Sequence, residues 1–198
     1  MKKNVYFVSG IDTNIGKSYA TAYLARVWRE KGINVITQKF IQTGNPAGYS
    51  EDIELHRRLM GLEYLPEDEQ GWTKPEIFSY PASPDLASRI DNRAVDFDKI
   101  NHATSVLSER FDAVLVEGAG GLMVPLTPDC LTIDYIQHSG YPLVFVTSGR
   151  LGSVNHTLLS FEAIERRGIS LQEDTENYIR HYMEKHFPEA EFVKVPCL

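Results

Sequence analysis

A glycine-rich segment near the start of the chain limits the possible folds more than any other feature. It reads Gly10-Ile11-Asp12-Thr13-Asn14-Ile15-Gly16-Lys17-Ser18, and it follows a short run at 4–9 that is rich in β-branched and aromatic residues. Apolar residues then recur with the spacing of one helical face over 17–31. Between a buried strand and a helix, the backbone N–H groups of such a loop and the positive end of the helix dipole can surround phosphate oxygens. The sequence therefore predicts a phosphate-binding loop (P-loop) at the first strand–helix junction.

Three residues of this loop carry the expected chemistry. Gly16 allows the backbone to approach phosphates closely, Lys17 can reach the β- and γ-phosphates, and the Ser18 hydroxyl can bind Mg²⁺. The loop has five residues between Gly10 and Gly16, whereas the usual pattern has four. A plain glycine-rich turn ahead of a helix is the alternative interpretation, but it gives no reason for the placement of Lys17.

Strand and helix patterns alternate along the rest of the chain. Further strands are predicted at 34–38, 113–116 and 142–147, and further helices at 53–60, 100–107, 131–138 and 154–166. The strand at 113–116 is apolar throughout, as a sheet covered on both faces requires. Strands separated by helices imply right-handed crossovers. We therefore expect an α/β, P-loop NTPase-like fold with a doubly wound, mainly parallel sheet flanked by helices, and one domain spanning 1–198.

One long stretch interrupts this alternation. The region 61–92 contains Pro66, Gly71, Pro75, Pro81 and Pro84. We interpret it as an irregular excursion with one strand near its middle, at position 77, and expect a functional or mobile loop.

Charged residues are predicted at the sheet edge where a P-loop protein binds its ligands. Glu117 ends the strand at 113–116, so its carboxylate can supply a second protein contact to Mg²⁺. Lys39 follows the strand at 34–38 and is expected at the same edge. Taken alone, Glu117 is also compatible with a solvated strand end, Lys39 with a surface lysine, and Asp52 with the charge preference of a helix N-terminus.

Composition excludes several classes of function. The net charge is −7 and no run of Lys or Arg reaches four residues, which argues against nonspecific nucleic-acid binding. No apolar run approaches the roughly 20 residues of a membrane helix, and the apolar stretch at the N-terminus is too short for a signal peptide. Cys130 and Cys197 form no metal-binding spacing, so we expect neither a zinc site nor a disulfide framework, and a cytoplasmic location.

Taken together, these motifs resemble the dethiobiotin synthetases. The resemblance runs from position 5 to about 168 and includes the P-loop with its extra residue. Its other stretches are Lys39 with Thr43-Gly44, Ser83-Pro84, Val116-Glu117-Gly118-Ala119-Gly120-Gly121 with Pro125-Leu126, and Gly149-Arg150-Leu151-Gly152-Ser153-Val154-Asn155-His156-Thr157. The resemblance implies ATP-dependent carboxylation of 7,8-diaminopelargonate with CO₂ or bicarbonate, and ring closure to dethiobiotin, by a homodimer.

The resemblance also implies roles for individual residues. Lys39 stabilises the carbamate and the acyl phosphate, while Lys17 acts with Mg²⁺ on the transferring phosphoryl group. Thr13 contacts carbamate or phosphate, and Thr43 hydrogen-bonds near the reacting amines. Asn155, at a helix N-terminus, binds the substrate carboxylate at a site that involves a partner subunit.

Two ligand sets follow from the same resemblance. Mg²⁺ is bound by Ser18, Asp52 and Glu117. ATP is bound by Asn14, Ile15, Gly16, Lys17, Ser18, Tyr19, Asp52, Glu117, Gly118, Ala119, Gly120, Pro196, Cys197 and Leu198.

The sequence departs from the family pattern at two places. Arg150, on the substrate side, stands where the pattern has lysine, and its planar guanidinium can contact a carboxylate differently. The region 168–174 lacks the expected strand and its adenine-recognising asparagine, and an amphipathic helix at 178–187 follows almost at once. Either that strand has been lost or residues are missing; we favour the second, because losing a strand removes many backbone hydrogen bonds. The segment 193–198 is predicted as the last strand and the start of the adenine-side segment.

Other classes of protein fit less well. A dinucleotide-binding fingerprint at 118–121 fails because Met123 occupies the position of its third glycine. A partition-type ATPase would carry an extra lysine between Gly10 and Gly16, although an amidoligase of cobalamin synthesis remains an alternative of the same fold. A metallochaperone would show a His/Cys-rich tract, whereas the six histidines here are scattered and are expected to pack or to hydrogen-bond. A serine hydrolase would need a G-x-S-x-G elbow, which is absent.

Overall fold

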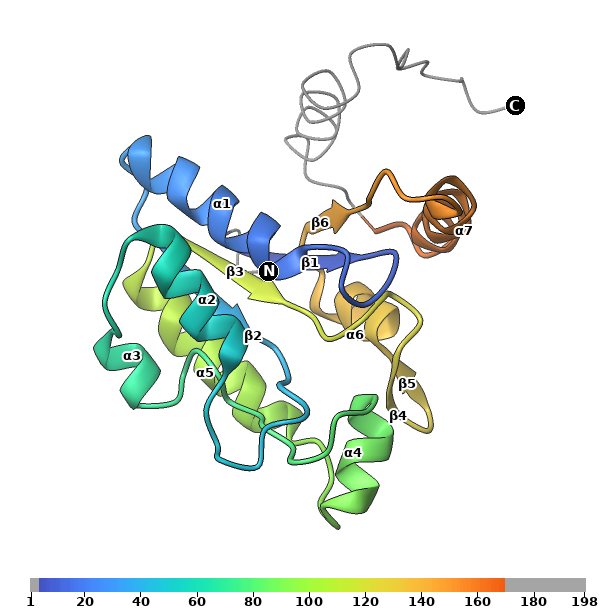
Figure 1. Cartoon of the computed structure of the whole chain (residues 1–198), viewed down its shortest axis with the longest axis horizontal. Coiled ribbons are helices and arrows are strands. Elements are labelled where there is room, and N and C mark those ends of the chain that lie inside the picture. Colours follow the sequence, from blue (N-terminus) through green and yellow to red (C-terminus); the bar gives the residue numbers. More distant parts are fainter. Residues whose placement is uncertain (1–3, 170–198) are drawn as a thin grey trace.

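A four-stranded parallel sheet forms the centre of the protein, shown by a computed structural model that describes residues 4–169 (Figure 1). Its strand order is β2-β3-β1-β6. The strands are β1 (Val5–Gly10), β2 (Val35–Lys39), β3 (Ala113–Glu117) and β6 (Leu143–Val146). Every pairing is parallel, so the carboxyl ends of all four strands lie at one edge of the sheet.

Helices and a short hairpin complete the described chain. The helices are α1 (Lys17–Glu30), α2 (Glu51–Met60), α3 (Pro66–Glu69), α4 (Pro84–Ile90), α5 (Phe97–Arg110), α6 (Thr132–Ser139) and α7 (Ser153–Arg166). The hairpin pairs β4 (Pro125–Thr127) with β5 (Cys130–Leu131) in antiparallel fashion. Side chains cap the N-termini of two of the longer helices. Ser50 accepts a hydrogen bond from the backbone N–H of Ile53 in α2, and Asp96 accepts one from the backbone N–H of Lys99 in α5.

The sheet is covered on both faces, as alternate residues of β1 demonstrate. Phe7 belongs to a buried cluster with residues of α5 and α6 such as Ile100 and Ile133. Val8, one position later, belongs to a second cluster with Trp28 of α1 and with a residue of α2. Since successive strand residues point to opposite faces, α1 and α2 cover one face, and α5 and α6 cover the other (Figure 1). The predicted fold class is confirmed.

The region 61–92 differs from its prediction. It contains α3 and α4, and near Ile77 it forms a single bridge to Gln42 in place of a strand. Pro66 and Pro84 are the first residues of their helices, where a missing N–H costs nothing and the fixed φ of proline suits a helix. The prediction of an irregular excursion did not include these two helices. The β4–β5 hairpin was also not predicted, while the remaining elements agree within one or two residues at most ends.

Some predictions fall outside residues 4–169. These are the missing adenine-side strand, the helix at 178–187, the strand at 193–198 and the ATP contacts at Pro196, Cys197 and Leu198. Within the described part, none of the helices combines the length and apolar character that a membrane span requires.

A candidate phosphate and metal site at the sheet edge

The candidate site is built where three neighbouring strands end. β1 ends at Gly10, β2 at Lys39 and β3 at Glu117. Lys39 and Glu117 are direct partners in the parallel register of β2 and β3. Paired residues of adjacent strands point to the same face, so the two side chains meet at the edge where the P-loop leaves the sheet.

The P-loop joins β1 to α1 through strained and tightly packed backbone. A Cβ atom at Gly10 would lie 2.4 Å from the carbonyl oxygen of Val146, so only glycine fits there. Asn14 and Gly16 have positive φ angles of 57° and 94°. No side chain caps the N-terminus of α1 and its first turn has no acidic residue, so its first N–H groups are open to an anion.

Two loop residues converge with residues from other elements. The buried Lys17 donates from Nζ to the carbonyl oxygen of Asp12 at 2.7 Å, so the amine folds back over the loop. Ser18 Oγ lies 2.7 Å from Asp52 Oδ1 and 2.9 Å from Glu117 Oε1. The hydroxyl has one proton to share between these two carboxylates.

Lys39 is held between the same two carboxylates. Its Nζ lies 2.6 Å from Asp52 Oδ2 and 2.8 Å from Glu117 Oε1, and it also donates to the carbonyl oxygen of Gly118 at 3.3 Å. Lys39 and Glu117 are both buried, and Asp52 is partly exposed. The structure therefore brings together five residues that the sequence analysis assigned to the site, from β2, α1, α2 and β3.

The oxygen atoms of this cluster suit a hard cation. Ser18, Asp52 and Glu117 offer a hydroxyl and two carboxylates, which are the ligand types that Mg²⁺ takes. Among residues 4–169, however, no group of three or more His, Cys, Asp or Glu side chains converges on one point. This set is therefore incomplete by itself, as is usual where phosphate oxygens and water supply the remaining Mg²⁺ ligands.

The charges of the site perturb one another strongly. Burial alone would lower the pKa of Lys39, but Glu117 and Asp52 raise it above its ordinary value. Burial would likewise raise the pKa of Glu117, but the charge of Lys39 and the hydrogen bond from His56 hold it well below its usual range. No carboxylate among residues 4–169 contacts Lys17, and burial together with the charge of Lys39 lowers its pKa to about 8. An incoming phosphate would relieve that penalty, because it brings the missing negative charge.

His56 is the main site residue that the sequence analysis did not single out. It is fully buried in α2, and its Nε2 lies 2.7 Å from Glu117 Oε2. One sequence signal was present: His56 follows Asp52 by four residues, which places both on the same face of a helix. That spacing alone does not reveal Glu117, which lies on a strand 61 residues further along.

A second glycine segment, 118–121, packs against the P-loop. A Cβ atom at Gly118 would lie 2.8 Å from Phe7 Cε1, and one at Gly121 would lie 3.3 Å from the carbonyl oxygen of Gly10. One at Gly120 would lie 3.4 Å from Thr13 Oγ1. The predicted ATP contacts at Gly118, Ala119 and Gly120 are thus placed beside the loop, together with the predicted catalytic residue Thr13.

The remaining predicted residues lie around this centre with fewer contacts. Thr43 follows β2 and is half-buried, while Tyr19 in α1 and Asn155 in the first turn of α7 are exposed. Arg150 pairs with Asp12 of the P-loop, which links the loop after β6 to the phosphate site. Asp12 had been given no role from the sequence. The backbone N–H of Thr13 and the side chain of Arg150 lower the pKa of its carboxyl group.

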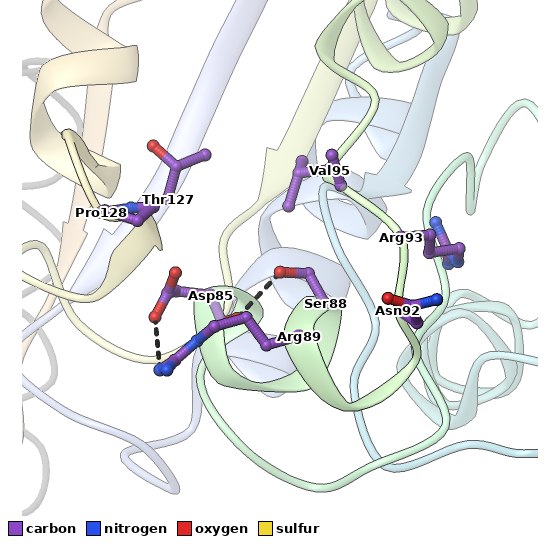
Figure 2. A pocket seen from close by; sticks show the side chains of 9 residues that line it. Asp85, Ser88, Arg89, Asn92, Arg93, Val95, Thr127 and Pro128 are labelled. Carbon is purple, nitrogen blue, oxygen red and sulfur yellow. Dashed lines mark hydrogen bonds and ion pairs between the residues drawn. The ribbon is translucent and has the colours of Figure 1, made fainter.

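A pocket of about 520 Å³ lies elsewhere, between α4 and the β4–β5 hairpin (Figure 2). Figure 2 shows Asp85 and Arg89 of α4 joined by an ion pair, with Thr127 and Pro128 on the opposite side. None of the predicted site residues that the structure describes lines this pocket. Its acidic and basic side chains on α4 already neutralise each other, so we place the chemistry at the P-loop.

Comparison with known proteins agrees with this geometry. A family described as AAA domain matches residues 4–173. The kinase domain of the Escherichia coli tyrosine kinase ETK aligns with a TM-score of 0.51 and 17% identity, covering 86% of this chain and 66% of that one, which supports the fold alone. The chain is thus a P-loop nucleotide-binding protein of the α/β class.

Proteins of similar sequence show to which family of P-loop proteins the chain belongs. An ATP-dependent dethiobiotin synthetase of Pasteurella multocida is 42% identical over 203 residues, covering 95% of both chains. A second one, from Haemophilus influenzae, is 50% identical over 167 residues, covering 84% of this chain and 87% of the relative. This chain belongs to the ATP-dependent dethiobiotin synthetase family, which confirms the resemblance drawn from its motifs.

Proposed function

We propose that this chain is an ATP- and Mg²⁺-dependent ligase that converts 7,8-diaminopelargonate and CO₂ into dethiobiotin, with ADP and phosphate as the other products. Family membership supports the reaction. The single structural observation that carries the site assignment is the position of the Lys39 ammonium group, 2.6 Å and 2.8 Å from two carboxylates beside the P-loop. Because the reaction consumes ATP, we place it in the cytoplasm.

The reaction has three bond-forming steps, and the residues suit each of them. One substrate amine attacks CO₂ and loses a proton, which gives a carbamate. The carbamate oxygen takes the γ-phosphoryl group of ATP, and the second amine then attacks the carbonyl carbon, expels phosphate and closes the cyclic urea. The positive charge of Lys39 would stabilise the anionic carbamate and acyl phosphate. Thr13 lies in the P-loop, where phosphate or carbamate would bind.

The P-loop would hold the phosphates of ATP. Lys17 and the first N–H groups of α1 supply positive charge at the loop, and the remaining proposed ATP contacts surround it. When bound through Ser18, Asp52 and Glu117, Mg²⁺ would neutralise charge on the phosphate oxygens. Thr43, Arg150 and Asn155 are proposed on the substrate side.

A product assay tests this proposal directly. The protein is incubated with Mg-ATP, ¹³C-labelled bicarbonate and 7,8-diaminopelargonate, and mass spectrometry is used to look for dethiobiotin labelled in the ureido carbon. We expect labelled product from the wild type and from Lys31→Ala, which removes an exposed lysine at the far end of α1. Lys39→Ala and Lys17→Ala should abolish it. ATP hydrolysis without labelled product would contradict the proposal and favour another P-loop ATPase, such as a cobalamin-type amidoligase.

A homodimer is part of the proposal, and the surface of α7 supports it. Leu151, Val154, Leu158 and Leu159 are more than half exposed on α7 and the loop before it. Large apolar side chains gathered in this way are typical of an interface between subunits. Sedimentation should give a dimer for the wild type and for Ile90→Asp on α4, and a monomer for Leu158→Asp. A monomeric wild type would contradict this assignment.

A further inference from the structure

The carboxylate of Glu117 is shared between two sets of partners. Its Oε1 faces Ser18 at 2.9 Å and Lys39 at 2.8 Å, on the side where the proposed metal would bind. Its Oε2 faces His56 Nε2 at 2.7 Å. The proposed roles of the site involve Oε1 and its neighbours, and they leave His56 unexplained.

The direction of the His56 hydrogen bond follows from chemistry. Oε1 of Glu117 accepts from the Lys39 ammonium group at 2.8 Å, which marks the side chain as a carboxylate, and a carboxylate can only accept. His56 Nε2 must therefore carry the proton and donate it to Oε2. His56 Nδ1 is also buried and has no hydrogen-bond partner among the described residues. With the proton on Nε2, Nδ1 carries no hydrogen, so the unsatisfied group is an acceptor lone pair and not an N–H donor.

Packing alone does not favour a histidine at this position. Buried polar atoms are nearly always paired, and an apolar side chain of similar size would fill the space without an unpaired Nδ1. The N–H group that His56 directs at Glu117 is the feature that an apolar residue would lack.

We propose that His56 is a positioning residue: its Nε2–H group fixes Oε2 of Glu117, so that Oε1 is held toward Ser18 and the proposed Mg²⁺ site. This inference rests on the proposed function for the location of the metal. A carboxylate with one oxygen anchored has less freedom to rotate away from a cation, which is how outer partners orient metal ligands. Arg57, the next residue of α2, bonds Thr37 and the buried Asp68 and so fixes the helix that carries His56.

Two substitutions of nearly equal shape separate hydrogen bonding from packing. His56→Gln keeps an N–H donor near the position of Nε2, whereas His56→Met has a similar length and no donor. For each protein, the affinity for a non-hydrolysable ATP analogue is measured with Mg²⁺ and with EDTA, and the ratio isolates the contribution of the metal. We expect this ratio to fall about tenfold in His56→Met and to stay near the wild-type value in His56→Gln.

A second measurement uses the unmodified protein. Nitrogen NMR of ¹⁵N-histidine-labelled wild type should show His56 protonated at Nε2 and bare at Nδ1. Because it needs only the folded wild type, this test holds even if a variant does not fold.

Three results would overturn the proposal. They are an unchanged ratio in His56→Met, an equal loss in both variants, and a tautomer with the proton on Nδ1. None of these measurements depends on dethiobiotin formation. A wild type that fails to make dethiobiotin but shows the expected ratios would therefore overturn the proposed function and leave the role of His56 intact.

Discussion

Replacing Lys17 by methionine should stabilise the free protein at neutral pH while abolishing its response to Mg-ATP. Lys17 is buried, no carboxylate in the described part of the chain contacts it, and its pKa falls from 10.5 to about 8. Each pKa unit corresponds to about 1.4 kcal/mol, so keeping this side chain charged costs the folded state at most about 3.5 kcal/mol. Methionine avoids that cost but loses the hydrogen bond to the carbonyl of Asp12, worth about 1.5 kcal/mol.

The expected net gain is therefore up to about 2 kcal/mol at pH 7. For a chain of this length, about 2 kcal/mol corresponds to a rise in Tm of about 6 °C. The gain depends on pH in a defined direction. Between pH 8 and 10.5 the folded wild type loses the Lys17 proton while the unfolded chain keeps it, so wild-type stability rises with pH. The advantage of the variant should be present at pH 7 and should shrink as the pH rises through this window.

Urea unfolding at pH 7 and at pH 10, followed by circular dichroism, measures this difference. Lys31→Met is the matched control, because it removes an exposed lysine at the opposite end of α1 and should change little at either pH. Added Mg-ATP should raise the Tm of the wild type and of the control, but not that of Lys17→Met. A Lys17→Met protein that is less stable than wild type at pH 7, or whose advantage is the same at both pH values, would refute the reasoning.

Three further changes have expected outcomes. Glu117→Gln should cost about 3 kcal/mol at pH 7, because it removes one of the two carboxylates that pair with the buried Lys39. Since the folded pKa of Glu117 is depressed, the difference from wild type should shrink as the pH falls below 4.5, and urea titrations at pH 7 and pH 4 check this. Gly10→Ala should lower stability by about 2 kcal/mol, because its Cβ would lie 2.4 Å from the carbonyl oxygen of Val146; a Tm equal to that of wild type would contradict this. Arg57→Met should cost about 4 kcal/mol by stranding the carboxylate of Asp68 in the interior, and the double variant with Asp68→Asn should recover part of the loss in chemical denaturation.

The sequence predicted the parts of the site that depend on strand ends. Glu117 and Lys39 follow apolar runs directly, and parallel strands end at one edge, so their proximity follows from the fold class alone. The P-loop was also predictable, because local patterns identify the strand before it and the helix after it.

Features that depend on how helices cross the sheet were not predictable from local patterns. His56 acquires its partner only because α2, packed against α1 and β2, carries it to the Glu117 carboxylate, and nothing in the residues around position 56 specifies that packing. The pair formed by Arg150 and Asp12 likewise joins two loops 138 residues apart. In the region 61–92, local patterns were ambiguous because a proline can either end a helix or begin one. Here Pro84 begins α4, and α4 packs against β4.

The strand order has a consequence for synthesis on the ribosome. β1 carries the P-loop and is made first, yet its two neighbours in the sheet, β3 and β6, come from more than a hundred residues later in the chain. The backbone of Val146 closes directly on Gly10, so the loop cannot take its final shape until β6 has left the exit tunnel. Pairings between such distant segments form slowly, and the segment 4–18 must wait unpaired while most of the protein is translated. Nascent chains stalled at increasing lengths should bind the phosphates of ATP only once β6 has emerged, because the P-loop closes against Val146.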